Sequence, residues 1–166
     1  MGSGELNWSE PSPELLSAYE ATDYVVDASG MGSGKHVLNV GTQGANAAAA
    51  LLRRVHARAA FIVTAWNPFS EPLRSEQNHA RQRQLLAQVA RKGYRWLPAA
   101  GVDRTGKWPP EESLCVLDPD AGFLHTVLVQ FEQNAVVEVT AAGARLVLHP
   151  GLSGASPASC PPPSSQ

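Results

Sequence analysis

The sequence predicts one α+β domain in which helices cover an antiparallel sheet, and three observations support this prediction. A chain of 166 residues has the usual length of a single domain. Its apolar content of 43% is enough to bury a core without disulfides or a metal. From residue 59 onwards, strand-like and helix-like runs follow one another in the order β-α-β-β-α-β. This is the order of a ferredoxin-like βαββαβ sandwich, here with additional N-terminal strands and a helix.

Local signals predict the N-terminal elements. They are, in order, a helix at 12–20, a strand at 24–26, a glycine-rich loop at 29–35, a strand at 36–40 and a helix at 45–57. Ser12 is a suitable cap for the first helix, and Pro13 suits its first position. Two short strands around a glycine-rich loop indicate a hairpin. The alanine-rich run at 45–57 favours a helix by intrinsic propensity.

The later elements begin with an apolar run at 59–66. This run stops at Asn67 and Pro68, so it predicts a buried central strand. The elements after it are a helix at 75–92, strands at 94–100 and 112–117, a helix at 120–131, and strands at 135–139 and 144–149. Ser75 is expected to cap the long helix and Gly93 to end it.

The domain is expected to span residues 12–149, after an extension at 1–11 and before a flexible tail at 150–166. The tail is rich in Ser and Pro, and it is too polar to offset the entropy lost on ordering. Cys115 lies in an apolar run and Cys160 in this tail, so the two are not expected to pair. The acidic N-terminus does not resemble a signal peptide, and no apolar run is long enough to span a membrane. These features predict a cytoplasmic protein with no membrane partner.

Charge is distributed unevenly along the chain. Residues 53–107 carry eleven Lys and Arg against three acids, a net charge of +8, whereas residues 1–52 and 108–166 each carry −5. A basic middle segment is typical of a surface that binds anions such as nucleic-acid phosphates. The alternative is that these charges neutralise the acidic ends across the folded surface.

The end of the apolar strand is the most distinctive feature. It brings Trp66 and Asn67 to the strand end, and Asn78 opens the inward stripe of the following helix. Two carboxamides are therefore expected near one helix N-terminus, which attracts anions through its free N–H groups. The alternative is that both side chains only bond loop backbone.

The glycine-rich loop at 29–35 invites comparison with a phosphate-binding P-loop, and the comparison fails. Ser29 stands where the first glycine is required, and His36 stands where a hydroxyl would hold magnesium. A strand rather than a helix is also predicted after the loop, so nucleotide hydrolysis is not expected there.

Asp103 and Glu112 are the candidate metal ligands. They flank one turn, and Mg²⁺ or Mn²⁺ commonly needs only one or two protein carboxylates beside phosphate and water. Glu112 is also a candidate general base toward water. The alternative is that both acids are merely solvated. Gln133 and Asn134 precede a strand, where they either contact a substrate or cap the preceding helix.

An ordered series of motifs runs through roughly residues 19–148. It consists of the FIVTAWNP segment at 61–68, Asn78, Gly101-Val102-Asp103, Trp108, Glu111-Glu112-Ser113 and Phe131-Glu132-Gln133-Asn134-Ala135. In this order the motifs resemble the bacterial domain-of-unknown-function family 3293. The resemblance implies a compact α/β domain and no established activity. It extends to the ferredoxin-like, metal-dependent nucleases among the CRISPR-associated Cas-two proteins, but Asn67 stands where those enzymes place an aspartate.

Two functions follow as expectations. The first is a metal-dependent nuclease or phosphodiesterase acting on DNA or RNA. Its catalytic residues would be Glu112, Asp103, Asn67 and Asn78, and its substrate contacts Trp66, Arg74, Arg81, Trp108, Gln133 and Asn134. The second is a non-enzymatic module that binds a small ligand through Asn67, Asn78, Glu112 and Asn134, or that forms a homodimer. The fold class does not decide between them.

Overall fold

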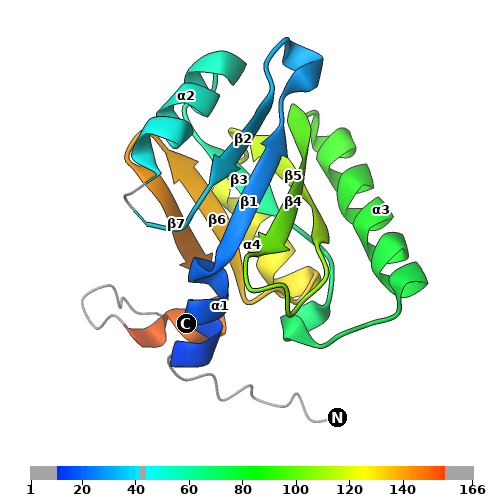
Figure 1. Ribbon diagram of the computed structural model, residues 1–166. Coiled ribbons are helices and arrows are strands. Elements are labelled where there is room, and N and C mark those ends of the chain that lie inside the picture. The colour runs from blue at the N-terminus through cyan, green and yellow to red at the C-terminus, as the bar shows by residue number, and fades with distance from the viewer. Residues whose placement is uncertain (1–10, 42–43, 156–166) are drawn as a thin grey trace.

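The computed structural model describes residues 11–41 and 44–155, and over this range the protein is an α+β domain (Figure 1). Seven strands form one sheet in the order β2-β1-β4-β5-β3-β6-β7, and each named strand runs antiparallel to its neighbours. Four α-helices of the described residues pack around this sheet. The α+β prediction is therefore confirmed.

The N-terminal elements follow the sequence prediction closely. They are α1 (Pro13–Glu20), β1 (Thr22–Asp27), β2 (Lys35–Leu38) and α2 (Ala45–Val55). Ser12 caps α1, since its Oγ accepts a hydrogen bond from the Leu15 backbone N–H at 3.1 Å. The two strands pair as the expected hairpin around the glycine-rich loop.

The remaining elements are β3 (Ala60–Val63), α3 (Ser75–Lys92), β4 (Trp96–Asp103), β5 (Glu111–Leu117), α4 (Ala121–Gln130), β6 (Ala135–Thr140) and β7 (Gly143–Leu148). Gly93 ends α3 in the left-handed region, with φ 75°. The predicted cap of α3 was wrong by one residue. Arg74 takes that position, because its backbone N–H is satisfied by the Gln77 side chain at 3.1 Å, and Ser75 is the first helical residue.

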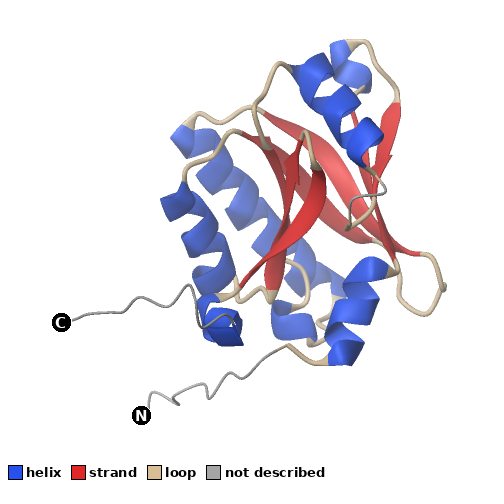
Figure 2. Cartoon of the chain, turned by 90° about the vertical axis from the view of Figure 1, so that its left-hand side faces the viewer, coloured by secondary structure: helices blue, strands red, loops and turns tan. Residues whose placement is uncertain are grey.

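The sheet curls, and its two faces enclose two separate apolar cores (Figure 2). The concave core lies between β1, the middle strands and α2, and it includes Val26, Leu51 and Ile62. The convex core lies beneath α3 and α4, and it includes Leu85 and Phe123. Strand β3 is buried along its whole length because it contributes side chains to both cores.

The connection from β3 through α3 leads to β4 rather than to the neighbouring strand. Strand β5 lies between β3 and β4, and β6 lies on the other side of β3. The N-terminal strands extend the sheet beyond β4, while α2 covers the opposite face from α3 and α4. The N-terminal strands thus extend the sheet, and the N-terminal helix α2 covers its other face.

The ordered chain continues past the predicted boundary at residue 149. Pro150–Ala155 form a short 3-10 helix, and Leu152 within it is buried. The Leu152 backbone N–H donates to the His149 carbonyl at 2.7 Å. The rest of the predicted tail and most of the predicted extension lie outside the described residues. None of the helices in residues 11–41 and 44–155 combines the length and apolar character needed to cross a membrane.

Candidate functional site

The chain leaves β3 through a loop of unusual backbone geometry. Three residues of this loop that are not glycine have positive φ: Asn67 at 46°, Phe69 at 49° and Ser70 at 65°. Such conformations cost free energy for L-residues and persist only where surrounding contacts hold them. A cluster of them beside polar side chains marks the end of β3 as a candidate site.

Asn67 and Asn78 hold this loop by bonding to one another. The Asn78 Oδ1 accepts from the Asn67 backbone N–H at 2.9 Å, and the Asn78 Nδ2 donates to the Asn67 Oδ1 at 2.8 Å. The same Asn67 oxygen accepts from the Leu73 backbone N–H at 3.0 Å. The predicted proximity of the two carboxamides is therefore present, and most of their bonding capacity goes to the loop.

The remaining amide donor of Asn67 reaches a carboxylate that the sequence did not single out. Asn67 Nδ2 donates to Glu111 Oε2 at 3.0 Å. Glu111 is half-buried, and this burial raises the pKa of its carboxyl above the ordinary value of 4.5, although the bond from Asn67 opposes the shift. Burial is the main cause that raises the pKa of Tyr19 and of Tyr24, and the charge of Glu111 adds to both shifts.

Glu112 lies on the opposite face of the same strand. Side chains alternate along β5, and Glu112 shares the convex face with Leu114 and Val116. Its Oε1 is 3.9 Å from the His79 Nε2, with both side chains about half exposed. His79 in turn makes an edge contact with Trp66, with ring centroids 5.2 Å apart. Glu112, His79 and Trp66 thus form a second, surface cluster next to the loop.

Asp103 is engaged by its own turn. Its carboxylate accepts from the backbone N–H groups of Thr105, Lys107 and Trp108 at 3.0 to 3.2 Å, and from the Thr105 hydroxyl. These bonds, that with the Thr105 side chain first, lower the pKa of Asp103 below 3.8. The alternation of strand side chains also places Asp103 and Glu112 on opposite faces of the β4–β5 hairpin.

The residues predicted to bind Mg²⁺ or Mn²⁺ do not fit a shared ion. Asp103 spends its oxygens on backbone N–H groups, and Glu112 faces His79 instead. Across residues 11–41 and 44–155, no three His, Cys, Asp or Glu side chains are grouped so that they could hold a metal. Binding of Mg²⁺ or Mn²⁺ therefore stays a prediction, and the described residues offer no set of ligands for it.

Of the predicted substrate contacts, three hold the loop and its neighbouring segments, two through backbone carbonyls and one through a side chain. Arg81 donates to the carbonyls of Ala65 and Phe131, and Gln133 Nε2 donates to the Trp66 carbonyl at 3.1 Å. Asn134 Nδ2 donates to the Ser70 hydroxyl at 3.0 Å. The side chains of Arg74 and Trp108 are exposed, and Trp108 retains 61% of its accessible surface.

Two buried donors near the end of β3 meet no protein acceptor within the described chain. They are Trp66 Nε1 and Gln82 Nε2. Gln82 is only 3% exposed, and its other atom, Oε1, accepts from the Ala65 backbone N–H at 2.9 Å. A buried donor without an acceptor is costly, so these two atoms favour a bound acceptor such as water or a ligand oxygen.

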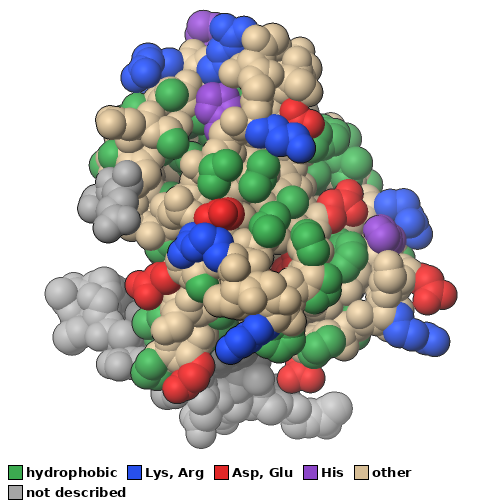
Figure 3. Space-filling view, viewed as in Figure 1, with side chains coloured by type: hydrophobic (Ala, Val, Ile, Leu, Met, Phe, Trp, Pro, Cys, Tyr) green, Lys and Arg blue, Asp and Glu red, His purple; other side chains and the backbone are tan. Residues whose placement is uncertain are grey.

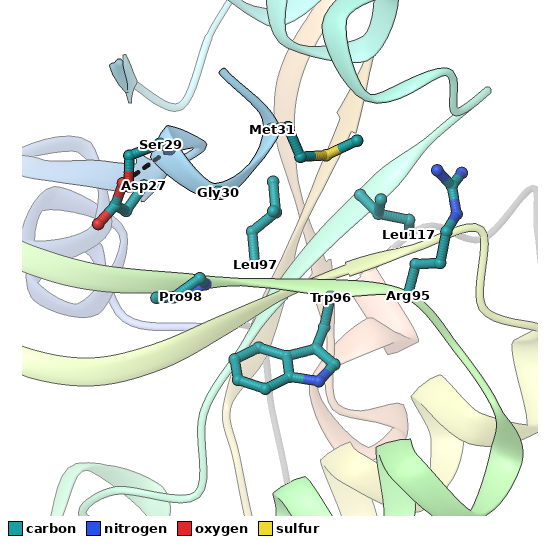
Figure 4. Close-up of a pocket in the computed structure, with 9 residues that line it drawn as sticks. All are labelled: Asp27, Ser29, Gly30, Met31, Arg95, Trp96, Leu97, Pro98 and Leu117. Atoms are coloured by element: carbon teal, nitrogen blue, oxygen red, sulfur yellow. Dashed lines mark hydrogen bonds between the residues drawn. The ribbon is translucent and has the colours of Figure 1, made fainter. Parts of the chain in front are cut away.

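A shallow cavity of about 460 Å³ lies beside the glycine-rich loop, at the other end of β1 (Figure 4). It is lined by Asp27, Ser29, Gly30, Met31, Arg95, Trp96, Leu97, Pro98 and Leu117. The Arg95 guanidinium is held by the carbonyls of Val55 and His56 at 2.8 and 3.0 Å. Asp27 accepts from the Ser29 backbone N–H. The two charged side chains of this cavity, Asp27 and Arg95, are thus bonded to the fold itself.

Comparison with known proteins gave a family match over the segment that contains the loop after β3 and its contacts. No curated protein and no solved structure matched the chain. The model of one family did match, and the matched segment contains Trp66, Asn67, Asn78, Glu111 and Gln133. Residues 63–136 match the model of the family described as protein of unknown function (DUF3293).

Proposed function

We propose that the chain is a phosphodiesterase that acts on DNA or RNA, with Glu111 as its general base. The observation that carries the proposal is the state of this carboxyl, which burial shifts to a higher pKa and which Asn67 holds at 3.0 Å. A perturbed acid fixed beside a strained loop is typical of a catalytic acid or base. The side chain is only partly buried, so water can reach it.

The chemical step is the transfer of one proton during hydrolysis. The ionised Glu111 accepts a proton from water as the water oxygen bonds to phosphorus, the bond from phosphorus to the leaving oxygen breaks, and the leaving oxygen takes a proton from solvent. A carboxylate of raised pKa is a stronger base than an ordinary one. Asn67 keeps one carboxylate oxygen bonded while the other is available to water. A positioned base contributes roughly 10²- to 10⁴-fold to such a rate.

The surface of α3 supports a phosphate-bearing substrate. Arg74, at the N-terminus of this helix, directly follows Leu73, whose N–H binds Asn67. Further along the helix Arg83, Arg91 and Lys92 are exposed, and none of these four cations forms an ion pair within the described part of the chain. Trp66 and His79 offer ring surface at which a base can stack.

We also propose that the segment from β3 to β6 is a ferredoxin-like unit. Its strands lie in the order β4-β5-β3-β6, so that β5 is inserted between the two strands joined by α3. Helices α3 and α4 both cover the convex face. This arrangement is that of a split βαβ motif followed by a second one.

Adjacent glutamates make a matched test of the proposal. Purified protein is incubated with single-stranded and duplex DNA and RNA, in Mg²⁺, in Mn²⁺ and in EDTA. Glu111→Gln is expected to reduce cleavage at least about 100-fold, because glutamine cannot accept the proton. Glu112→Gln and Asp103→Asn are expected to stay within a few fold of the parent chain. The rate should rise with pH with a midpoint above 4.5.

The outcome that overturns Glu111 as the base is equal cleavage by the parent chain and Glu111→Gln. If Glu112→Gln and EDTA abolish cleavage instead, the metal-dependent mechanism is supported with Glu112 as its ligand.

The non-enzymatic ligand-binding module is a second candidate, favoured by the two buried donors of Trp66 and Gln82. It predicts no turnover of any substrate in the assay above. It also predicts a change in tryptophan fluorescence on titration with mononucleotides, which Trp66→Phe removes and Trp108→Phe does not. An unchanged fluorescence in the parent chain removes this candidate.

A further inference from the structure

The convex face of β2, β1 and β4 is left without a helix. Helices α3 and α4 cover the convex side of β5, β3 and β6 only, and α2 lies on the concave side. In Figure 1 the uncovered strands face the viewer, with no helix in front of them. Side chains that point to this side therefore meet solvent in the single chain.

Apolar side chains line this uncovered face in register. Val25 lies opposite Val37 on one side and opposite Ala100 on the other, so the three share one row across the strands. Val37 is 47% exposed, an unusual state for a valine in a sheet. Trp96 is 37% exposed and points away from the concave core, opposite to its neighbour Leu97 (Figure 4). The space-filling view in Figure 3 shows apolar side chains gathered over the middle of this face.

The charges at the two ends of the face are balanced. At one end Asp27 lies directly opposite Lys35. Towards the other end Asp23 forms an ion pair with Arg104 at 2.8 Å. Each end thus carries one acid and one base. Glu112 lies beside the face, opposite Ala100, and its carboxylate is 3.9 Å from the His79 ring, so the face has no excess of positive charge for a nucleic acid to bind.

We infer that this face is where a second copy of the chain docks, with the two sheets packed face to face. An apolar patch rimmed by charges usually marks an interaction surface. A rim with an acid and a base at each end is complementary to itself, because a two-fold axis can bring each acid against a base of the other copy. Sheets packed in this way lie about 10 Å apart, which buries the valine and tryptophan side chains.

The assembly leaves the Glu111 site open. Glu111 shares the concave face with Cys115 and Leu117, whereas the docking face is convex. Dimer formation and cleavage are therefore independent properties, and the failure of one proposal does not affect the other.

Sedimentation equilibrium of the full chain from low micromolar to several hundred micromolar concentration tests the inference. The parent protein is expected to approach twice the 17.6 kDa mass of one chain. Val37→Glu is expected to weaken the dimer at least tenfold, because it places a charge in the apolar row of both copies. Lys35→Glu, at an exposed position, is expected to weaken the dimer to a smaller extent. This substitution leaves two acids and no base at one end of the face.

Val129→Glu is the matched control. Val129 is 45% exposed, close to the value for Val37, but it lies on α4, away from the docking face. Circular dichroism and melting curves show that each variant is folded. A parent chain that stays monomeric throughout overturns the inference. So does a dimer that Val129→Glu weakens as much as Val37→Glu.

Discussion

Two acid-bearing regions at the same end of the β4–β5 hairpin differ in how their contacts are made. The Asp103 turn is local, because every partner of its carboxylate lies within five residues. The Glu111 region is assembled from distant segments, since Asn67 lies 44 residues before Glu111 in the chain, and Asn78 lies 11 residues after Asn67. Asp103 therefore stabilises its own turn, whereas the position of Glu111 depends on the tertiary fold.

The two carboxyls respond to their surroundings in opposite directions. Hydrogen bonds, that of the Thr105 side chain foremost, lower the pKa of Asp103, whereas burial raises the pKa of Glu111. Asp103 is therefore stabilised in its charged form and contributes stability to the fold. Burial makes the charged form of Glu111 less favourable, and a carboxyl with such a raised pKa is compatible with a functional role.

Asn78→Ala tests the Glu111 region and is expected to have the largest effect on stability. Asn78 is 2% exposed, and its loss leaves the Asn67 backbone N–H without its acceptor. The free energy of unfolding should fall by about 2–4 kcal/mol. Urea denaturation monitored by circular dichroism measures this change. Gln84→Ala, at an exposed position of the same helix, should change stability by less than about 0.5 kcal/mol; an equal loss in both variants contradicts the role of Asn78.

Asp103→Ala tests the local turn and should have a smaller effect. We expect a decrease of a few degrees in the melting temperature at neutral pH. Because the pKa of Asp103 is lowered in the folded protein, its contribution to stability is present above pH 3.8. This contribution is lost as the pH falls through the folded pKa. The difference between variant and parent should therefore narrow in acid. A difference that is independent of pH would show that the charge of Asp103 is not what stabilises the turn.

Glu111→Gln should change stability in the opposite sense. The raised pKa of Glu111 means that the parent loses stability as the pH rises from 4.5 through the folded value. Glutamine keeps an acceptor for Asn67 and does not ionise, so the variant should melt a few degrees higher at neutral pH and with the parent below pH 4.5. Calorimetry at both pH values is the measurement. Glu112→Gln serves as the control. If it raises the melting temperature by the same amount, the burial of Glu111 is not the cause of the gain.

Trp108→Ala should have the smallest effect on stability. Trp108 is 61% exposed at the tip of the hairpin, and its backbone N–H, which the substitution retains, makes the bond to Asp103. The melting temperature should stay within about one degree. If affinity for single-stranded DNA nonetheless falls, the ring is a contact for bases. A loss of several degrees would instead assign the ring to packing.

The order and type of the elements could be predicted because their signals are local. Ser12 caps its helix and Gly93 ends another in a left-handed conformation. The buried strand is present but ends at Val63, three residues before its predicted end, and Asn67 and Pro68 begin the 3-10 turn that follows. The pairing of Asn67 with Asn78 also followed from their places at a strand end and a helix start. These features depend on residues close in the sequence or on adjacent elements.

The identity of the positioned acid could not be predicted. Strand β5 is buried on both faces, so its apolar run gives no alternation that tells Glu111 from Glu112. The choice depends on the register that places Glu111 opposite Gly101, where Thr22 and Tyr24 pack close to the glycine. Arg81 illustrates the same limit, since the carbonyl of Phe131 that it binds is 50 residues away.

The strand order also has a consequence for how the chain is made. Strand β3 lies between β5 and β6, so as synthesis proceeds from the N-terminus it has no neighbour until residues 111–117 are available. During that interval the apolar segment at 60–63 is unpaired on both edges, a state in which nascent chains aggregate. Helix α2 precedes β3 and packs on the same concave core, so it is the element able to shield this segment first. Substitutions that weaken α2 should therefore lower the yield of folded protein more than they lower its stability once folded.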